Sequence, residues 1–372
     1  MCMVCDAWLR AIRDDPETWR ALLVTHDRRS VLDLPTDHLF RRLVDDGALP
    51  ILATDVRRLV PNLSWVTTVV LASSTFTEPW GTAREAPQAK LWRERRYIDY
   101  VWPVLSALCG LSFPSLRKLA VDLAALVCHS CDNARLDVVF RWLRDGLPAG
   151  LEVLKVEEVE LLDERLADWE QTHQQGGLLD RYVHLKGLQW IDYEPLPKAC
   201  FDPDGMLQTL EVLDWSDCSN HYDPKQFASF ENLRMLKIQI SEPTAEDLAN
   251  LCEAMPASVK VLYLNWDFST PFSLVEWSVF GVLQGLVEFC VCLDVCDYFA
   301  EGVGPATITS HLAQLLPKTT ILIAEWLEGG GKNGPNPNEI WCPPDILDRG
   351  FLPLCVPDWH RLPGAYQPPV GS

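Results

Sequence analysis

The sequence predicts an α/β fold in which short strands and helices alternate as repeated units. Two observations predict it: an apolar pattern recurs along most of the chain, and the segments between recurrences have helical character. Composition agrees, with 48% hydrophobic and 23% charged residues, which is typical of folded proteins. A repeat architecture can hold all 372 residues in one elongated domain.

The recurring pattern places apolar residues at positions 1, 4 and 6 of a six-residue stretch. Successive matches begin 35, 34, 25, 23, 26 and 27 residues apart. The last two positions alternate along a short strand and share one face, which only neighbouring strands can bury. The seven matches are Leu116-Leu119-Val121, Leu151-Leu154-Val156, Leu185-Leu188-Trp190, Leu210-Leu213-Trp215, Leu233-Leu236-Ile238, Val259-Leu262-Leu264 and Leu286-Phe289-Val291.

Three segments between the matches predict helices. In residues 244–255, Thr244 is a suitable N-cap, and apolar residues then follow at helical spacing until Pro256 ends the segment. Residues 136–143 and 274–283 have the same character. Strands that alternate with helices predict a parallel sheet.

From residue 60 to 327 the chain resembles leucine-rich-repeat proteins, whose motif is L-x-x-L-x-L. The resemblance implies a solenoid with a curved parallel sheet on its concave side and helices outside. Val66-Val69-Leu71 and the segment at Thr320-Leu322 are candidate end repeats. The Asn or Cys that usually follows each strand of the family is mostly missing, which leaves the repeat boundaries open.

The N-terminal segment predicts two short helices. One face of the first carries apolar residues from Val4 to Ile12. Asp15 is a suitable N-cap and Pro16 a suitable first residue for the second helix, whose apolar side would hold Trp19, Leu22 and Leu23.

The Val4-Cys5 pair, Trp8 and the Asp15-Pro16-x-x-Trp19 turn resemble the second half of an F-box. The F-box opening has no counterpart before them, and Leu34-Pro35 is a second possible opening that the other features do not follow. A two-helix cap over the first repeat is the alternative. The resemblance implies an all-α segment that binds the Skp1 adaptor of a cullin-based ubiquitin ligase. Its adaptor-binding residues would be Val4, Cys5, Trp8, Leu9, Ile12, Pro16 and Trp19.

The domain organisation that follows has four parts. Residues 1–25 are partial F-box-like helices, 26–59 a helical linker or cap, and 60–327 the leucine-rich-repeat solenoid. Residues 328–372 are rich in Gly and Pro and predict a loosely ordered tail.

Strand residues between the apolar positions predict a partner-binding concave face, because solenoids bind partners there. Met235 and Tyr263 are the expected anchors, and acidic members of the set suit basic partner side chains. The predicted set is Lys155, Glu157, Gln189, Asp214, Met235, Lys237, Tyr263 and Asn265.

Charge narrows the range of partners. The 32 Lys and Arg against 52 Asp and Glu give a net charge of −20, which argues against nucleic acid and anionic membranes and suits a basic protein. No apolar run approaches the roughly 18 residues of a membrane span. We find no secretory signal, so reduced cysteines and a cytoplasmic or nuclear location are expected.

No catalytic, metal or cofactor motif is complete. Cys128-x-x-Cys131 and Cys2-x-x-Cys5 lack the second ligand pair of a zinc site. The glycine-rich segment 329–334 lacks the spacing of a phosphate-binding loop. We therefore expect no enzyme. The expected function is a protein-binding substrate receptor of a Skp1-cullin-F-box ubiquitin ligase, and the alternative is a scaffold or inhibitor without a ligase link.

Overall fold

The computed structural model describes residues 13–25, 47–71, 102–122, 133–157, 179, 181–191, 208–216, 224–241, 244–267, 272–294 and 303–326. The chain divides into two compact units, Met1–Leu185 and Lys186–Ser372. Each unit contains a parallel sheet whose strands are separated along the chain by other elements. This is the α/β arrangement that the leucine-rich-repeat resemblance implies.

In the N-terminal unit, the strand order is β5-β4-β3-β1-β2 and every neighbouring pair is parallel. The strands are β1 (Ala21–Thr25), β2 (Leu49–Leu52), β3 (Thr68–Leu71), β4 (Lys118–Asp122) and β5 (Val153–Glu157). Its helical elements are η1 (Pro16–Trp19), α4 (Ala53–Leu59), η2 (Leu63–Trp65), α7 (Asn133–Arg141) and the π-helical turn η4 (Trp142–Gly146). Pro50 lies in β2, at the edge of the described sheet, where a missing N–H is tolerated.

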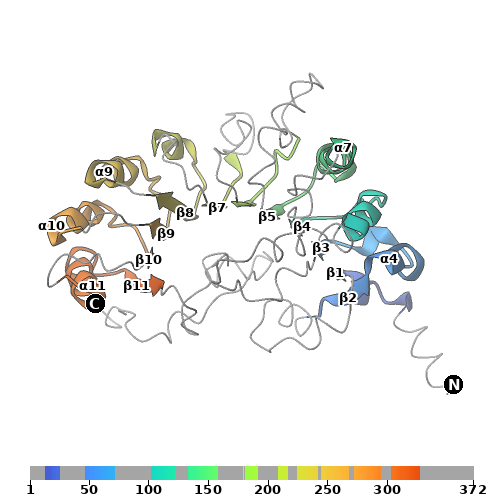
Figure 1. Ribbon diagram of the computed structural model, residues 1–372, viewed down its shortest axis with the longest axis horizontal. Helices are drawn as coiled ribbons and strands as arrows, with labels where there is room; N and C mark the ends of the chain where they lie inside the picture. Colours follow the sequence, from blue (N-terminus) through green and yellow to red (C-terminus); the bar gives the residue numbers. More distant parts are fainter. Residues whose placement is uncertain are drawn as a thin grey trace, which may run out of the picture. The chain divides into compact units, whose positions relative to one another are not determined.

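In the C-terminal unit, the strands follow one another in chain order and all neighbours are parallel. They are β6 (Gly187–Ile191), β7 (Val212–Ser216), β8 (Met235–Ser241), β9 (Val261–Asp267), β10 (Glu288–Asp294) and β11 (Thr320–Trp326). The helical elements are η7 (Pro224–Ser229), α9 (Ala245–Ala254), α10 (Leu274–Trp277), η8 (Ser278–Val282) and α11 (Pro305–Leu315). Figure 1 shows α9, α10 and α11 on one side of strands β8 to β11.

The apolar positions of the repeat form the core, as predicted. Every one of them whose side chain is described is at most 4% exposed, from Leu116 to Val291. The first position also closes a turn, since the N–H of Leu185 donates to the Tyr182 carbonyl at 3.0 Å and that of Val259 to the Pro256 carbonyl at 3.0 Å. Full burial of each such side chain contributes about 1.5–3 kcal/mol.

A shared backbone carbonyl sets the register between neighbouring repeats. The Lys186 carbonyl accepts from the N–H groups of Glu211 at 2.7 Å and Val212 at 2.9 Å. The Arg117 carbonyl of the N-terminal unit accepts from Glu152 and Val153 at 2.7 and 2.9 Å. The carbonyls of Arg20, Thr67, Glu211, Arg234 and Lys260 also accept two such bonds each, so equivalent residues of the repeats that they join lie side by side.

The three predicted helical segments are helical in the structure. Thr244 caps α9 through a reciprocal pair: its hydroxyl accepts from the Asp247 N–H at 3.1 Å, and the Asp247 carboxylate accepts from the Thr244 N–H at 2.8 Å. Ser273 and Glu276 form the same capping box on α10. Such caps satisfy N–H groups that the first helical turn leaves without partners.

The prediction of a second N-terminal helix is wrong. Pro16–Trp19 forms a single 3-10 turn, and the chain then enters β1, which lies between β2 and β3. Leu22 and Leu23 are 0% exposed within this strand. A short continuous apolar run fits a buried strand as well as a helix, and only the neighbouring strands decide between them.

The N-terminal boundaries also change. An all-α segment over 1–25 is not shown, since its last residues are β1, and the sheet includes strands that precede residue 60. The 26–59 segment contains strand β2 as well as helix α4. Val4, Cys5, Trp8, Leu9 and Ile12 lie outside the described residues, and so does the predicted tail 328–372.

Gly146 gives a test of packing in the π-helical turn. A Cβ added at Gly146 lies 2.6 Å from Cδ1 of the Trp142 indole, a rigid ring that is 4% exposed. We expect Gly146→Ala to lower the free energy of unfolding by about 1–3 kcal/mol, because overpacking displaces buried side chains. Urea unfolding measures it.

Gly150→Ala is the matched control, because nothing lies within 4 Å of a Cβ at Gly150. Equal stability of the two variants would show that the ring contact does not constrain position 146.

Candidate functional site

A row of polar side chains crosses four neighbouring strands of the C-terminal unit. Gln189 of β6 is paired in register with Asp214 of β7, Asp214 with Lys237 of β8, and Lys237 with Tyr263 of β9. Each of these side chains is at most 1% exposed. The row contains four of the predicted partner-binding residues, and the parallel register brings them together.

Lys237 occupies the centre of the row. Its Nζ donates to Asp214 Oδ2 at 3.1 Å and lies 5.4 Å from the centroid of the Tyr263 ring. Removing two charges from water costs several kcal/mol, which the ion pair and the attraction of the ring for the ammonium group offset. The pair therefore depends on both partners remaining in place.

Gln189 is the first residue of the row. Within the described part of the chain, neither its Nε2 nor its Oε1 atom makes a hydrogen bond.

The expectation that this face is open to a partner is wrong for most of the predicted set. Met235 is 0% exposed and Lys155 of the N-terminal unit is 4% exposed, in addition to the polar row. Alternation along a strand predicts which face a side chain is on, but not whether solvent reaches that face. Glu157 and Asn265 lie in β5 and β9, and their side chains are outside the description. A binding role for the set stays a prediction.

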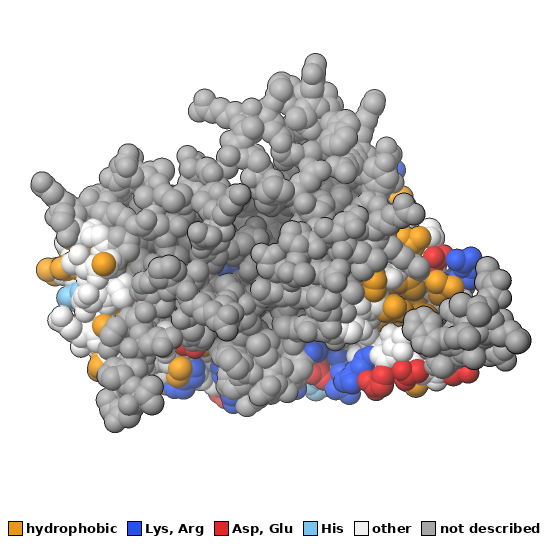
Figure 2. Space-filling model, turned by 90° about the horizontal axis from the view of Figure 1, so that it is seen from below, with side chains coloured by type: hydrophobic (Ala, Val, Ile, Leu, Met, Phe, Trp, Pro, Cys, Tyr) orange, Lys and Arg blue, Asp and Glu red, His pale blue; other side chains and the backbone are white. Residues whose placement is uncertain are grey.

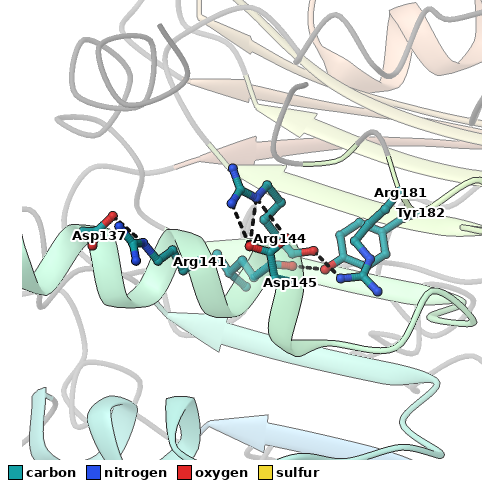
Figure 3. A network of polar contacts seen from close by, with 7 residues as sticks. Asp137, Arg141, Arg144, Asp145, Arg181 and Tyr182 are labelled. Carbon is teal, nitrogen blue, oxygen red and sulfur yellow. Dashed lines mark hydrogen bonds and ion pairs between the residues drawn. The ribbon is translucent and has the colours of Figure 1, made fainter. Parts of the chain in front are cut away.

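A second polar cluster lies at the C-terminal end of α7 (Figure 3). Arg141 Nε donates to Asp137 Oδ1 at 2.9 Å. Arg144 makes a forked contact with Asp145, with Nε 3.0 Å from both carboxylate oxygens and Nη2 2.7 Å from Oδ2. The hydrogen bonds from Arg144 lower the pKa of Asp145, and the positive charges of Arg144, Arg181 and Arg141 lower it further.

The turn before β6 completes this cluster. Arg181 Nη1 donates to the Arg144 carbonyl at 2.7 Å, and the Tyr182 hydroxyl donates to the Leu143 carbonyl. Burial raises the pKa of Tyr182, so its hydroxyl keeps the proton that it donates. Both carbonyls belong to the π-helical turn, where backbone acceptors lack helical partners.

No sequence motif predicts that these residues form a cluster. Asp137 and Arg141 are four residues apart on one helix, an ordinary surface pair. Arg181 comes 37 residues after Arg144, in a segment without motif. Only the stacking of the two repeats brings its guanidinium to this turn.

A serine–histidine hydrogen bond joins two helical elements. Ser278 Oγ lies 2.9 Å from His311 Nε2, a distance found in nucleophile–base pairs. Ser278 Oγ also donates to the Leu274 carbonyl at 3.0 Å, as helical serines do. No carboxylate orients His311 among the residues that the structure describes, so we interpret the contact as a tie between η8 and α11.

The described ranges contain no group of three or more His, Cys, Asp or Glu that could hold a metal ion. Burial raises the pKa of Cys252 to about 12, so its thiol stays protonated at neutral pH. In the same ranges, no helix has the length and apolar character needed to cross a membrane.

No protein-family model and no curated protein matches the chain. Among solved structures, the chain is similar to the leucine-rich repeat-containing protein LegL7 from Legionella pneumophila. The two are 10% identical with a TM-score of 0.33, over 70% of this chain and 83% of that chain.

The buried ion pair gives a second prediction. We expect Asp214→Ala to cost about 3–5 kcal/mol of unfolding free energy, since the Lys237 ammonium would remain buried without its carboxylate. The double variant Asp214→Val/Lys237→Met should recover much of the loss, because it buries no charge. Urea unfolding of the single variants Asp214→Val and Lys237→Met and of the double variant measures the coupling.

Arg58→Ala serves as the control, since it breaks the Arg58–Asp55 pair by truncating an arginine side chain that is 72% exposed. Its cost should be about 0.5 kcal/mol. Additive effects at Asp214 and Lys237 would contradict the coupling.

Proposed function

We propose that this chain is a protein-binding leucine-rich-repeat protein and not an enzyme. The supporting observation is the column of charged residues that immediately precede strands β6 to β9 of the C-terminal unit, namely Lys186, Glu211, Arg234 and Lys260. Lys186 and Lys260 are exposed, and Glu211 and Arg234 are half-buried. The shared carbonyl bonds hold successive members of the column at about the 4.8 Å spacing of neighbouring strands.

This column suits a protein partner better than a small substrate. Arg234 Nε lies 3.8 Å from Glu211 Oε2, so the column contains charges of both signs side by side. Figure 2 shows that Lys and Arg side chains also lie beside Asp and Glu side chains at the lower right of its view. Fixed charges of both signs favour complementary partners through electrostatic specificity. The net charge of −20 favours a partner that is basic overall.

A photo-crosslinking amino acid at position 260 tests the proposal. We expect defined protein adducts from cell extract, and we expect them to disappear when Arg234 and Lys186 are both replaced by Gln. Position 275 is the control, because Val275 is 80% exposed and lies on α10, away from the column. Equal adducts from positions 260 and 275 would count against a dedicated surface.

A second candidate function is substrate receptor of a Skp1-cullin-F-box ubiquitin ligase in the cytoplasm or nucleus. The Asp15-Pro16-x-x-Trp19 turn favours it: Asp15 accepts from the Glu17 N–H at 3.2 Å and from the Thr18 hydroxyl at 2.9 Å, and Trp19 is 6% exposed. The adaptor-binding residues of this proposal are the set named above from Val4 to Trp19. A scaffold or inhibitor without a ligase link remains the alternative.

Co-purification with Skp1 distinguishes the ubiquitin-ligase receptor from the scaffold or inhibitor. We expect Trp8→Ala to reduce binding at least tenfold if the F-box resemblance is functional, because tryptophan anchors dominate interfaces. Trp8 is preferred to Trp19, since Trp19 is buried and its truncation would test folding. Val275→Ala is the control on an exposed helix. Absence of Skp1 binding by the unchanged chain would favour the scaffold or inhibitor.

A further inference from the structure

The cluster at the end of α7 contains more positive than negative charge. Three guanidinium groups, from Arg141, Arg144 and Arg181, act on one carboxylate, that of Asp145. Arg141 and Arg144 have carboxylate partners at 2.9 and 2.7 Å, in Asp137 and Asp145. Arg181 makes no ion pair among the described residues, so the cluster has an excess of one positive charge. Such an excess is notable in a chain of net charge −20.

The cluster is partly open to solvent, with Arg181 half-buried, and its geometry is constrained. The side chains of Arg141 and Asp145 are 57% and 58% exposed, whereas that of Arg144 is 14% exposed. The hydrogen bond to the Arg144 carbonyl holds Arg181 against the π-helical turn, and its guanidinium lies 6.0 Å from the centroid of the Tyr182 ring. A guanidinium fixed in this way loses less side-chain entropy when it binds an anion.

We propose that Arg141, Arg144 and Arg181 form an oxyanion-binding site for a carboxylate or phosphate group on a polypeptide partner. The site deepens the proposed protein-binding function and rests on it. Planar guanidinium groups recognise both oxyanions through forked N–H donors. Asp145 occupies part of the site in the free protein, as its forked contact with Arg144 shows, and it competes with the incoming anion.

A polypeptide fits the site better than a nucleic acid. Nucleic-acid affinity grows with the number of phosphates that basic residues neutralise. Here one excess positive charge stands against a chain of net charge −20. A single acidic or phosphorylated side chain needs one such subsite, and neighbouring contacts can supply the remaining affinity.

Fluorescence anisotropy with three labelled peptides of one sequence tests the proposal on the full chain. The peptides carry a central glutamate, phosphoserine or glutamine, and a fluorescent single-stranded oligonucleotide is the fourth probe. We expect the glutamate or phosphoserine peptide to bind at least fivefold more tightly than the glutamine peptide. The stronger of the two identifies the source of the oxyanion. Equal binding of all three peptides, or tighter binding of the oligonucleotide, overturns the proposal.

Two variants with opposite expected effects separate recognition from folding. Arg181→Gln should weaken binding of the anionic peptide about fivefold, because it removes the excess guanidinium. Asp145→Asn should strengthen it about twofold to fivefold, because it removes the competing carboxylate. A purely structural role predicts no such gain. Arg58→Gln is the control, since Arg58 is a paired, exposed arginine of α4 in the same unit.

Thermal unfolding of each variant establishes that it is folded. An Arg181→Gln variant that is folded and binds as tightly as the unchanged chain overturns the proposal. If adducts at position 260 persist while the peptides show no preference for charge, the oxyanion site fails and the protein-binding function stands. If both are absent, the protein-binding function fails with it.

Discussion

The structure depends on one constraint: every repeat must place its strand beside another strand of the sheet, in parallel and in register. A single five-residue strand cannot bury its apolar face, so the face is buried only when neighbours stack. Where the carbonyl before a strand is shared by two N–H groups of the next repeat, it fixes the register, as at Lys186 and Arg117. A one-residue slip would turn Leu213 and Trp215 out of the core and polar residues into it.

The same register explains the polar row. Positions that are equivalent in successive repeats become neighbours across the sheet, so Asp214 meets Lys237 and Lys237 meets Tyr263. A charge at one such position is tolerated only where the next repeat supplies its partner. Gln189 is buried in the same row, and its side-chain atoms make no hydrogen bond among the described residues.

Helix ends are the second place where hydrogen bonds join one repeat to the next. The carbonyls of Leu143 and Arg144 lie at a helix end, where backbone acceptors lack helical partners. The Tyr182 hydroxyl donates to the first of them and the Arg181 guanidinium to the second. Close approach of the Trp142 ring requires glycine at position 146 in the same turn. The hydrogen bonds that hold the arginine cluster in place therefore also join the two repeats, which supports its geometry.

The sequence alone determined the α/β class, the strand positions from Leu116 to Val291 and helix α9 with its Thr244 cap, because these follow from local periodicity and capping. It also placed Asp214, Lys237 and Tyr263 on one face. The tertiary structure decided that Leu22 and Leu23 form a strand, since a short apolar run has no periodicity to separate strand from helix. It decided that the described side chains of the predicted binding set are buried, because exposure depends on what lies against a face. It also brought Arg181 to Arg144, since contacts between distant residues follow from stacking and are not encoded in either local segment.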